Sequence, residues 1–440
     1  MLIEFSVTNF RSIREKQTLS LVASGAAKEL PECLIERNLP GLSGLRFLKG
    51  AAIYGANASG KSNIIKAMRF LAEFVKNSAT WGRPGDSIGT EPFRLDQDSP
   101  SSPSRFEVAF LTGGIRFSFG CSLTTNRVTE EYIVAYPKGA PQHWYHRSYN
   151  ESAGSYDWAR PSASFRHDQA LRDRTRENCL FLSVAPQFNH PQLTQPFSWF
   201  RDCLRLIGGD LPFGLLGDDY GSSLTTRTAR LLTQPSHHER IIGLLRSADV
   251  GIIGGKADER ELETPNFLSY FSSPEFLGKY GASDTIPSDR KTLDVALLHR
   301  SLGNEEVAFD FESEESAGTQ RLFALIGPWI DALDQGLTIF VDEIEASLHP
   351  AIVRGILSLI FSAEHNPKGA QVIFTTHSPV LLDNTLMRRD QIWFTEKAPT
   401  GATRLYPLTD YQPRKDEALA KGYLAGRYGA IPFLPDGLKL

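Results

Sequence analysis

The chain has 440 residues, of which 41% are hydrophobic and 22% charged, a composition typical of globular proteins with a buried core. A formal net charge of −4 gives no argument for nucleic-acid binding, and without a run of about 18 apolar residues no transmembrane helix is expected. Four scattered cysteines without a CxxC pair argue against a disulfide frame or a zinc site, so we expect a cytoplasmic protein.

The predicted elements begin with a strand at residues 2–8, where apolar and polar side chains alternate. This start lacks the basic, then apolar, then small-residue order of a signal peptide. A second strand at 45–54 leads directly into a turn that contains glycine. After the turn, apolar residues recur at helical spacing and predict an amphipathic helix that ends near Asn77.

The turn between this strand and this helix has the sequence of a phosphate-binding loop. The pattern GxxxxGK[ST] is matched by Gly55, Ala56, Asn57, Ala58, Ser59, Gly60, Lys61 and Ser62. Glycines let the backbone N–H groups of such a loop face the phosphates of ATP, at the positive end of the following helix. Lys61 is expected to reach the β- and γ-phosphates, and the Ser62 hydroxyl to ligate Mg²⁺. An accidental glycine turn is the alternative, but the flanking strand and helix favour a true P-loop.

The next part of the chain predicts a loop and then an antiparallel sheet. Residues 78–104 are rich in Gly, Pro, Ser and Asp, as loops are. Short alternating segments then predict strands at 106–111, 115–121 and 128–136.

From residue 186 to residue 305 the pattern becomes partly helical. Candidate helices separated by loops lie at 197–207, 222–232, 238–247 and 293–302. No sustained heptad repeat is present, which argues against long coiled-coil arms. We therefore predict an N-terminal ATPase part at 1–185, an inserted helical domain at 186–305 and a C-terminal ATPase part at 306–440.

Alternating helices and strands after residue 305 predict a parallel α/β sheet. The expected elements are a helix near 316–334, a strand at 337–341, a helix at 350–363 and a strand at 372–376. The first strand ends in two carboxylates: Asp342 would hold Mg²⁺, and Glu343 would orient or deprotonate the attacking water. A core strand that ends in exposed acids by chance is the alternative. His377 ends the second strand and could reach the γ-phosphate as a switch, although a lone histidine is usually structural.

A small-residue turn opens the helix predicted near 316–334. Its residues Ser316, Gly318 and Gln320 lie at a helix N-terminus, where free N–H groups, a hydroxyl and the helix dipole favour an anion. Read alone, Ser316 is only an N-cap. Its position 26 residues before Asp342 favours a second nucleotide-binding segment.

Together the motifs resemble the pattern of ABC-type ATPases: P-loop, signature, Asp-Glu pair and switch histidine, in that order. The signature is a variant, because Ala317 and Thr319 depart from the usual two-glycine form. Two segments, Asn9 to Ile13 and Glu343 to Pro350, resemble the RecF, SMC and OLD branch. A third, Gly422 to Pro432, resembles OLD-like AAA-family ATPases of the RloA and AbiL kind. The resemblance covers roughly residues 1–75 and 306–440.

The resemblance implies an α/β fold with an antiparallel β lobe and a parallel core sheet. It also implies that two copies sandwich ATP, so that Ser316, Gly318 and Gln320 of one subunit face the γ-phosphate held at the other's P-loop. Arg11 would contact nucleotide in cis. The chain would then form a homodimer or a larger even-numbered assembly. The motifs place no Q-loop glutamine firmly, and Gln187 is a candidate.

Three functions are compatible with these motifs. The favoured one is a sensing and scaffolding ATPase of an antiviral defence pair, which responds to a viral trigger protein and controls a separately encoded effector, such as a TOPRIM-type nuclease. The alternative is a RecF-like ATPase that clamps DNA, which the acidic balance disfavours. A P-loop kinase is the third, and Glu343 directly after Asp342 argues against it because this pair suits attack by water. Whether nucleic acid binds is left open by the sequence, and no membrane partner is expected.

Overall fold

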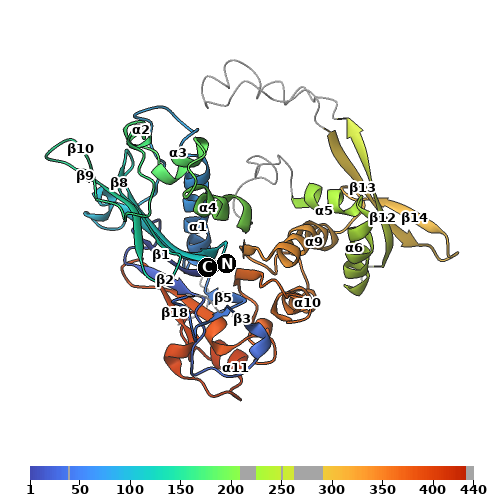
Figure 1. Cartoon of the computed structure of the whole chain (residues 1–440). Helices are drawn as coiled ribbons and strands as arrows, with labels where there is room; N and C mark the ends of the chain where they lie inside the picture. The colour runs from blue at the N-terminus through green and yellow to red at the C-terminus, as the bar shows by residue number, and fades with distance from the viewer. Residues whose placement is uncertain (38–39, 209–223, 249–250, 262–290, 433–440) are drawn as a thin grey trace. The chain divides into compact units, whose positions relative to one another are not determined.

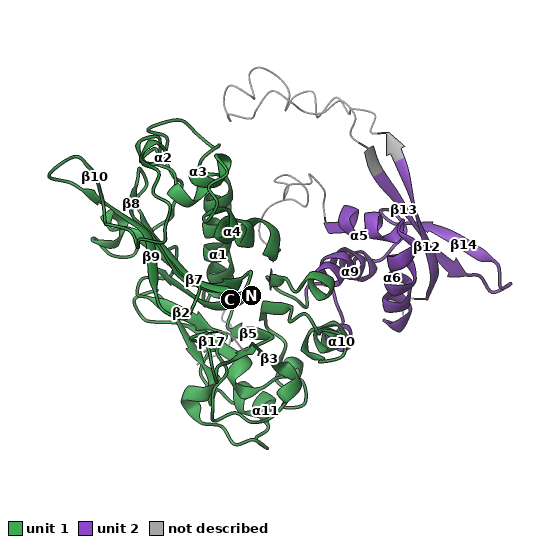
Figure 2. Cartoon of the chain, viewed as in Figure 1, with its two compact units in different colours: residues 1–209, 332–345, 353–440 green, residues 210–331, 346–352 purple. Residues whose placement is uncertain are grey.

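The computed structural model describes residues 1–37, 40–208, 224–248, 251–261 and 291–432 (Figure 1). The chain divides into two compact units, which Figure 2 colours separately: residues 1–209, 332–345 and 353–440 form the first, and residues 210–331 and 346–352 the second. The boundaries predicted between 185 and 186 and between 305 and 306 stay predictions. Within the described ranges, no helix combines the length and the apolar character needed to cross a membrane.

The first unit contains a seven-stranded antiparallel sheet in the order β10-β9-β8-β7-β6-β1-β2. Its strands are β1 (Leu2–Thr8), β2 (Gln17–Ser20), β6 (Ser104–Thr112), β7 (Ile115–Leu123), β8 (Val128–Tyr136), β9 (Gln142–Asn150) and β10 (Ser155–Trp158). On β6 the side chains alternate, with Phe106, Val108 and Phe110 in the core. The strand predicted at 2–8 and the three antiparallel strands after the loop are confirmed, and β9 and β10 extend the sheet.

A buried carboxylate joins this sheet to helix α3 (Phe181–Gln187). Glu131 on β8 accepts hydrogen bonds from the Tyr145 hydroxyl (2.7 Å) and from Arg147 Nε (2.8 Å) on β9. It also accepts from the backbone N–H groups of Phe181 (2.8 Å) and Leu182 (2.9 Å). Glu131 and Arg147 are fully buried. Because a buried charge is tolerated only when it is paired and hydrogen-bonded, these contacts fix α3 against the sheet.

The second sheet of this unit has the order β11-β15-β16-β5-β17-β18. Its strands are β5 (Gly50–Gly55), β11 (Leu204–Ile207), β15 (Thr338–Val341), β16 (Gln371–Thr376), β17 (Ile392–Lys397) and β18 (Thr403–Pro407). Neighbouring strands are parallel except for the antiparallel edge pair β17 and β18. Every residue of β5, β15 and β16 is buried, as expected for strands of a parallel sheet. The predicted fold class, α/β with an antiparallel lobe and a parallel core sheet, is confirmed.

Helix α1 (Lys61–Asn77) packs against strands of both sheets, β1 and β5. Its buried residues, among them Ile64, Met68 and Leu71, recur at helical spacing. They join one hydrophobic core that reaches Phe106 in the antiparallel sheet and Ile373 in the parallel sheet. The predicted helix after the P-loop is thereby confirmed.

Among the described residues, the second unit combines three helical segments with a three-stranded antiparallel sheet in the order β12-β13-β14. Its elements are α5 (Leu224–Leu232), α6 (Pro235–Ser247), β12 (Ile252–Glu261), β13 (Lys291–Arg300), β14 (Glu306–Asp310) and most of α9 (Ala317–Gln335). Thr228 on α5 accepts a hydrogen bond from the Gly327 N–H (2.9 Å) and donates one to the Phe323 carbonyl (2.7 Å) on α9. A Cβ atom at Gly327 would lie 2.6 Å from the Thr228 hydroxyl oxygen, so this glycine permits the close approach of the two helices.

Several predicted elements need correction. The strand predicted at 45–54 is two strands in different sheets, β4 (Arg46–Leu48) and β5, interrupted at Lys49. The helix predicted at 197–207 ends early, because residues 204–207 form β11 and pair in parallel with β15. Of the segment predicted as a helix at 293–302, residues 293–300 belong to β13, where Val295 and Leu297 are buried at the two-residue spacing of a strand. In both helix errors, pairing with other strands overrides local periodicity: β11 pairs with β15, and β13 with β12 and β14.

The other predicted helices are confirmed. They are α5 for its described part, α6, α9 and α10 (Pro350–Phe361). Residues 222–223 of the second predicted helix lie outside the described residues.

Candidate functional site

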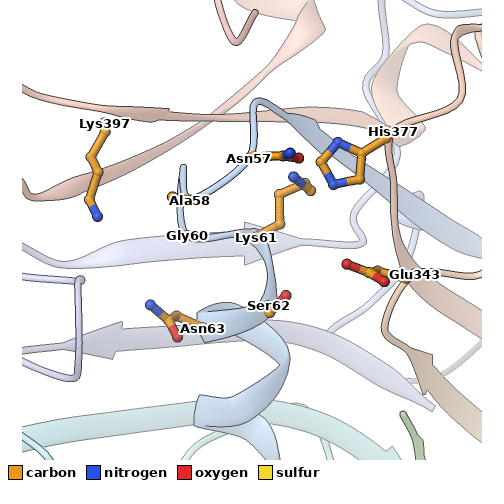
Figure 3. Close-up of a pocket in the computed structure, with 9 residues that line it drawn as sticks. All are labelled: Asn57, Ala58, Gly60, Lys61, Ser62, Asn63, Glu343, His377 and Lys397. Carbon is orange, nitrogen blue, oxygen red and sulfur yellow. The ribbon is translucent and has the colours of Figure 1, made fainter. Parts of the chain in front are cut away.

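The parallel sheet brings the candidate catalytic residues to one edge. Strands β5, β15 and β16 are parallel, so their carboxyl ends meet, and there ligands of open α/β sheets bind. The P-loop follows β5, Asp342 and Glu343 follow β15, and His377 follows β16. A cavity of about 480 Å³ opens at this edge (Figure 3), lined by Asn57, Ala58, Gly60, Lys61, Ser62, Asn63, Glu343, His377 and Lys397.

Threonine hydroxyl groups on β17 and β18 form hydrogen bonds with Ser59 of the P-loop. The hydroxyls of Ser59 and Thr395 are hydrogen-bonded at 2.7 Å, and the Thr403 hydroxyl donates to the Ser59 carbonyl at 2.9 Å. A Cβ atom at Gly60 would lie 2.0 Å from the Thr403 hydroxyl oxygen, and one at Gly55 would lie 2.4 Å from that of Thr395. Gly60 also has a φ of +104°. Both glycines are therefore needed for the close contact of the loop with β17 and β18, and Gly60 is needed for the shape of the loop as well.

The buried ammonium group of Lys61 is available to bind an anion. Its ammonium donates to the carbonyl oxygens of Gly55 (2.8 Å) and Ala56 (3.0 Å), and only 5% of the residue is exposed. Burial lowers the pKa of Lys61 to about 8, although the nearby carboxylates, Asp342 first, act in the opposite direction. A buried ammonium held only by carbonyl oxygens would gain from contact with a phosphate.

Asp342 is the centre of a small oxygen cluster. Its Oδ1 accepts hydrogen bonds from the Ser62 hydroxyl at 3.0 Å and from the Thr375 hydroxyl at 2.6 Å. A serine hydroxyl beside a single carboxylate is the hard-oxygen donor set that Mg²⁺ takes when nucleotide phosphates supply the other ligands. The predicted metal ligands, Ser62 and Asp342, are thus adjacent and fit a magnesium ion.

Glu343 and His377 also line the cavity (Figure 3). Glu343 has a φ of +50°, a strained conformation for a residue with a side chain, and its N–H donates to the Thr375 hydroxyl at 2.7 Å. The backbone N–H of His377 donates to the carboxylate of Glu345. Burial and then the charge of Lys61 lower the pKa of His377, so its imidazole is neutral at pH 7 and can donate one hydrogen bond.

The signature residues belong to the second unit. The Ser316 hydroxyl accepts from the Thr319 N–H at 3.1 Å, as an N-cap does, and Ser316 itself is exposed at the start of α9. The Gln320 side chain donates to the Phe311 carbonyl at 2.9 Å, which ties the preceding segment to the helix. A Cβ atom at Gly318 would lie 2.9 Å from the Ser347 carbonyl oxygen. Their action on a nucleotide in trans stays a prediction.

Two further predicted residues are not among those lining the cavity. The Arg11 guanidinium forms an ion pair with Glu91 at 2.6 Å. Gln187 is exposed at the end of α3. A nucleotide contact by Arg11 and a Q-loop role for Gln187 therefore stay predictions.

The sequence motifs missed residues that complete the site. Thr375 links Asp342 to Glu343, Thr395 and Thr403 support the P-loop, and Lys397 lines the cavity. The only signal for Thr375 is a polar residue within the apolar strand β16. For the others no motif exists, because their positions depend on the pairing of β17 with β5 and of β18 with β17.

Comparisons with known proteins identify a family and a set of similar structures. A family model described as "AAA domain, putative AbiEii toxin, Type IV TA system" matches residues 51–383. The SMC head domain from Thermotoga maritima is 13% identical, with a TM-score of 0.38 over 92% of this chain and 98% of that chain. An SmcHead bound to the C-winged helix domain of ScpA is 14% identical, with a TM-score of 0.42 over 93% of this chain and 99% of that chain. No curated protein matches the sequence.

Proposed function

The chain belongs to the AAA-domain family whose model spans residues 51–383, and on this premise we propose that it binds ATP with Mg²⁺ in the cavity and hydrolyses the γ-phosphate. One observation carries the proposal: the P-loop, the hydrogen-bonded pair of Ser62 and Asp342, and the side chains of Glu343 and His377 converge at one sheet edge. Nucleotide hydrolysis needs these parts together and little covalent chemistry from the protein.

Each group has a task that follows from its charge and surroundings. Lys61 would leave the loop carbonyls and bind the β- and γ-phosphate oxygens, while the N-terminus of α1 favours their negative charge. Ser62 and Asp342 would hold Mg²⁺, which when bound neutralises charge on the phosphates. The Glu343 carboxylate, at the cavity surface, would orient the attacking water and accept its proton. Neutral His377 would donate a hydrogen bond to the γ-phosphate.

Phosphate release and nucleotide binding test this proposal with two variants. Lys61→Ala should bind ATP about 100-fold more weakly, because the buried cation is lost. Glu343→Gln should bind ATP as the parent does but release phosphate about 100-fold more slowly. Glu364→Gln, an exposed acid outside the cavity, is the control and should change neither quantity. Unchanged turnover in Glu343→Gln would remove this residue from the mechanism.

We further propose that ATP joins two copies through a composite site, with Ser316 and Gln320 of one copy completing the P-loop site of the other. The proposal is supported by the exposed N-terminus of α9, where the Ser316 hydroxyl and free N–H groups can meet an anion. Neither Lys61→Ala nor Ser316→Arg alone should be active. Mixing the two variants should restore part of the activity, because one composite site is then intact. If no mixing ratio restores activity, the result would contradict a composite site that is active while the second site of the dimer is inactive.

For the cellular role we propose a sensor and scaffold that controls a separately encoded effector, such as a nuclease, in antiviral defence. The family description names a putative toxin of a type IV toxin–antitoxin system, and such a system has more than one component. Mass photometry without nucleotide, with ADP and with ATP, repeated with products of neighbouring genes, tests it. ATP-dependent co-assembly with one product is expected. An ATP-driven dimer that ignores every product but closes on duplex DNA would favour a RecF-like clamp instead.

A further inference from the structure

Lys397 lines the nucleotide cavity, yet no motif and no step of the proposed hydrolysis uses it. It ends β17, which runs parallel to β5 with Thr395 opposite Gly55. The hydroxyl of Thr395 faces the P-loop at Ser59, and side chains two apart on a strand share a face. Lys397 therefore faces the cavity, whereas Glu396 between them faces away and accepts a hydrogen bond from Tyr406 (3.0 Å).

Strand order puts Lys397 across the P-loop from the hydrolytic groups. In the sheet, β5 lies between β16 and β17, and β15 lies beyond β16. His377 and Glu343 therefore flank the P-loop on one side and Lys397 on the other. Figure 3 shows the same order, with Lys397 on one side of the P-loop residues and His377 and Glu343 on the other.

The two lysines of the cavity have different surroundings. Lys61 is buried and held by loop carbonyls, whereas Lys397 is exposed and has no carboxylate partner within the described part of the chain. If Lys61 binds the β- and γ-phosphates next to Glu343, the end of the cavity with Lys397 and Asn63 must take the other half of the nucleotide. In that half, the α-phosphate is the only anion.

We infer that Lys397 binds the α-phosphate and is a second cationic contact for the nucleotide, an inference that rests on the proposed ATP site. ATP and ADP both carry this phosphate, so the contact strengthens the binding of both equally. Such uniform binding lowers KM without raising kcat. Lys397 would thus set the affinity for nucleotide without changing kcat, whereas Glu343 would act on the rate of hydrolysis and Lys61 on the β- and γ-phosphates.

The test compares Lys397→Gln and Lys397→Arg with the parent protein, and uses Lys138→Gln, an exposed lysine in the turn after β8, as the control. Titration calorimetry and steady-state hydrolysis should give about tenfold weaker ATP and ADP binding in Lys397→Gln, with kcat unchanged. Lys397→Arg should recover most of the affinity. Equal affinities in Lys397→Gln and the parent, or a loss for ATP but not for ADP, would overturn the inference.

Sulfur substitution at the α-phosphate separates this contact from one to the sugar or base. The parent should distinguish one diastereomer of ATPαS from ATP, and Lys397→Gln should lose that distinction, because the altered oxygen no longer has its partner. A weakened Lys397→Gln that keeps the parent's preference would place the contact elsewhere and overturn the assignment. A parent protein that binds no ATP would instead refute the proposed function, before Lys397 is considered.

Discussion

The hydroxyl of Ser62 donates to Oδ1 of Asp342 across 3.0 Å, although 280 positions separate the two residues in the sequence. The contact joins the first turn of α1 to the end of β15. The donor set for a magnesium ion is therefore assembled within the first unit alone. Binding of Mg²⁺ would need to replace only the hydrogen bond between Ser62 and Asp342 with one metal–oxygen contact to each residue.

Replacing Thr375 by valine should slow hydrolysis about 10- to 100-fold with little change in ATP affinity. The valine keeps the shape of the side chain but removes the hydroxyl that orients Asp342 and accepts the Glu343 N–H. Thr338→Val on β15, also buried but at the far end of its strand, should leave turnover unchanged. Equal kcat values in the two variants, measured by phosphate release, would show that the Thr375 hydroxyl does not position the acidic pair.

Gly60→Ala should abolish ATP binding and lower the melting temperature. The new methyl group would meet the Thr403 hydroxyl at 2.0 Å, in a loop residue with positive φ. Gly85→Ala is the matched control, because Gly85 also has a positive φ (+87°) but open space around the added atom. If the two variants lose equal stability and both bind ATP, Gly60 is required because of its positive φ and not because of its close contact with Thr403 on β18.

ATP affinity should fall as pH rises above about 8. Burial lowers the pKa of Lys61 in the free protein to about 8, whereas bound phosphates favour its ammonium and raise that pKa. Above pH 8 the free protein has therefore lost a proton that the complex keeps, so binding takes one up and weakens by up to about tenfold per pH unit. The terminal phosphate, with a second pKa near 6, is already ionised there. Calorimetry at pH 9 in two buffers of different ionisation enthalpy should show proton uptake; none would contradict the assignment.

Glu131→Gln should lower the free energy of unfolding by about 3–5 kcal/mol. The change leaves the guanidinium of Arg147 buried without its counter-charge and weakens the four hydrogen bonds that hold β9 and α3. Its neighbour Glu130 is partly exposed, and Glu130→Gln should cost no more than about 1 kcal/mol. Urea denaturation of both variants checks the difference. Similar midpoints would mean that the buried pair contributes little net stability.

The sequence was sufficient for the parts of the site that lie next to one another in the chain. The P-loop, its following helix and the strand before Asp342 and Glu343 are predicted from local patterns, and the structure confirms that helix and that strand. A buried parallel strand followed by a polar residue is a strong local signal. Such signals indicate which elements form and which residues end them.

Contacts that depend on long-range pairing could not be predicted. The support from Thr395 and Thr403, and the position of Lys397, follow from the pairing of β17 with β5 and of β18 with β17. Residues 204–207 became a strand only because β15 offers a parallel edge. No periodicity within a window of ten or twenty residues contains this information, since Ala52 of β5 pairs with Ile392 of β17, 340 positions later, and Leu204 of β11 with Thr338 of β15, 134 positions later.

The seat of the P-loop has a consequence for synthesis on the ribosome. Ser59 is held by Thr395 and Thr403, which are translated 336 and 344 residues after it. At about 5–20 residues per second, this interval lasts roughly 20 to 70 s. During that time the loop lacks its supporting strands. ATP stabilises only states that bind it, so it would add little stability to the nascent chain. At the proposed site, ATP binding would therefore report a chain whose C-terminal strands have already joined the sheet.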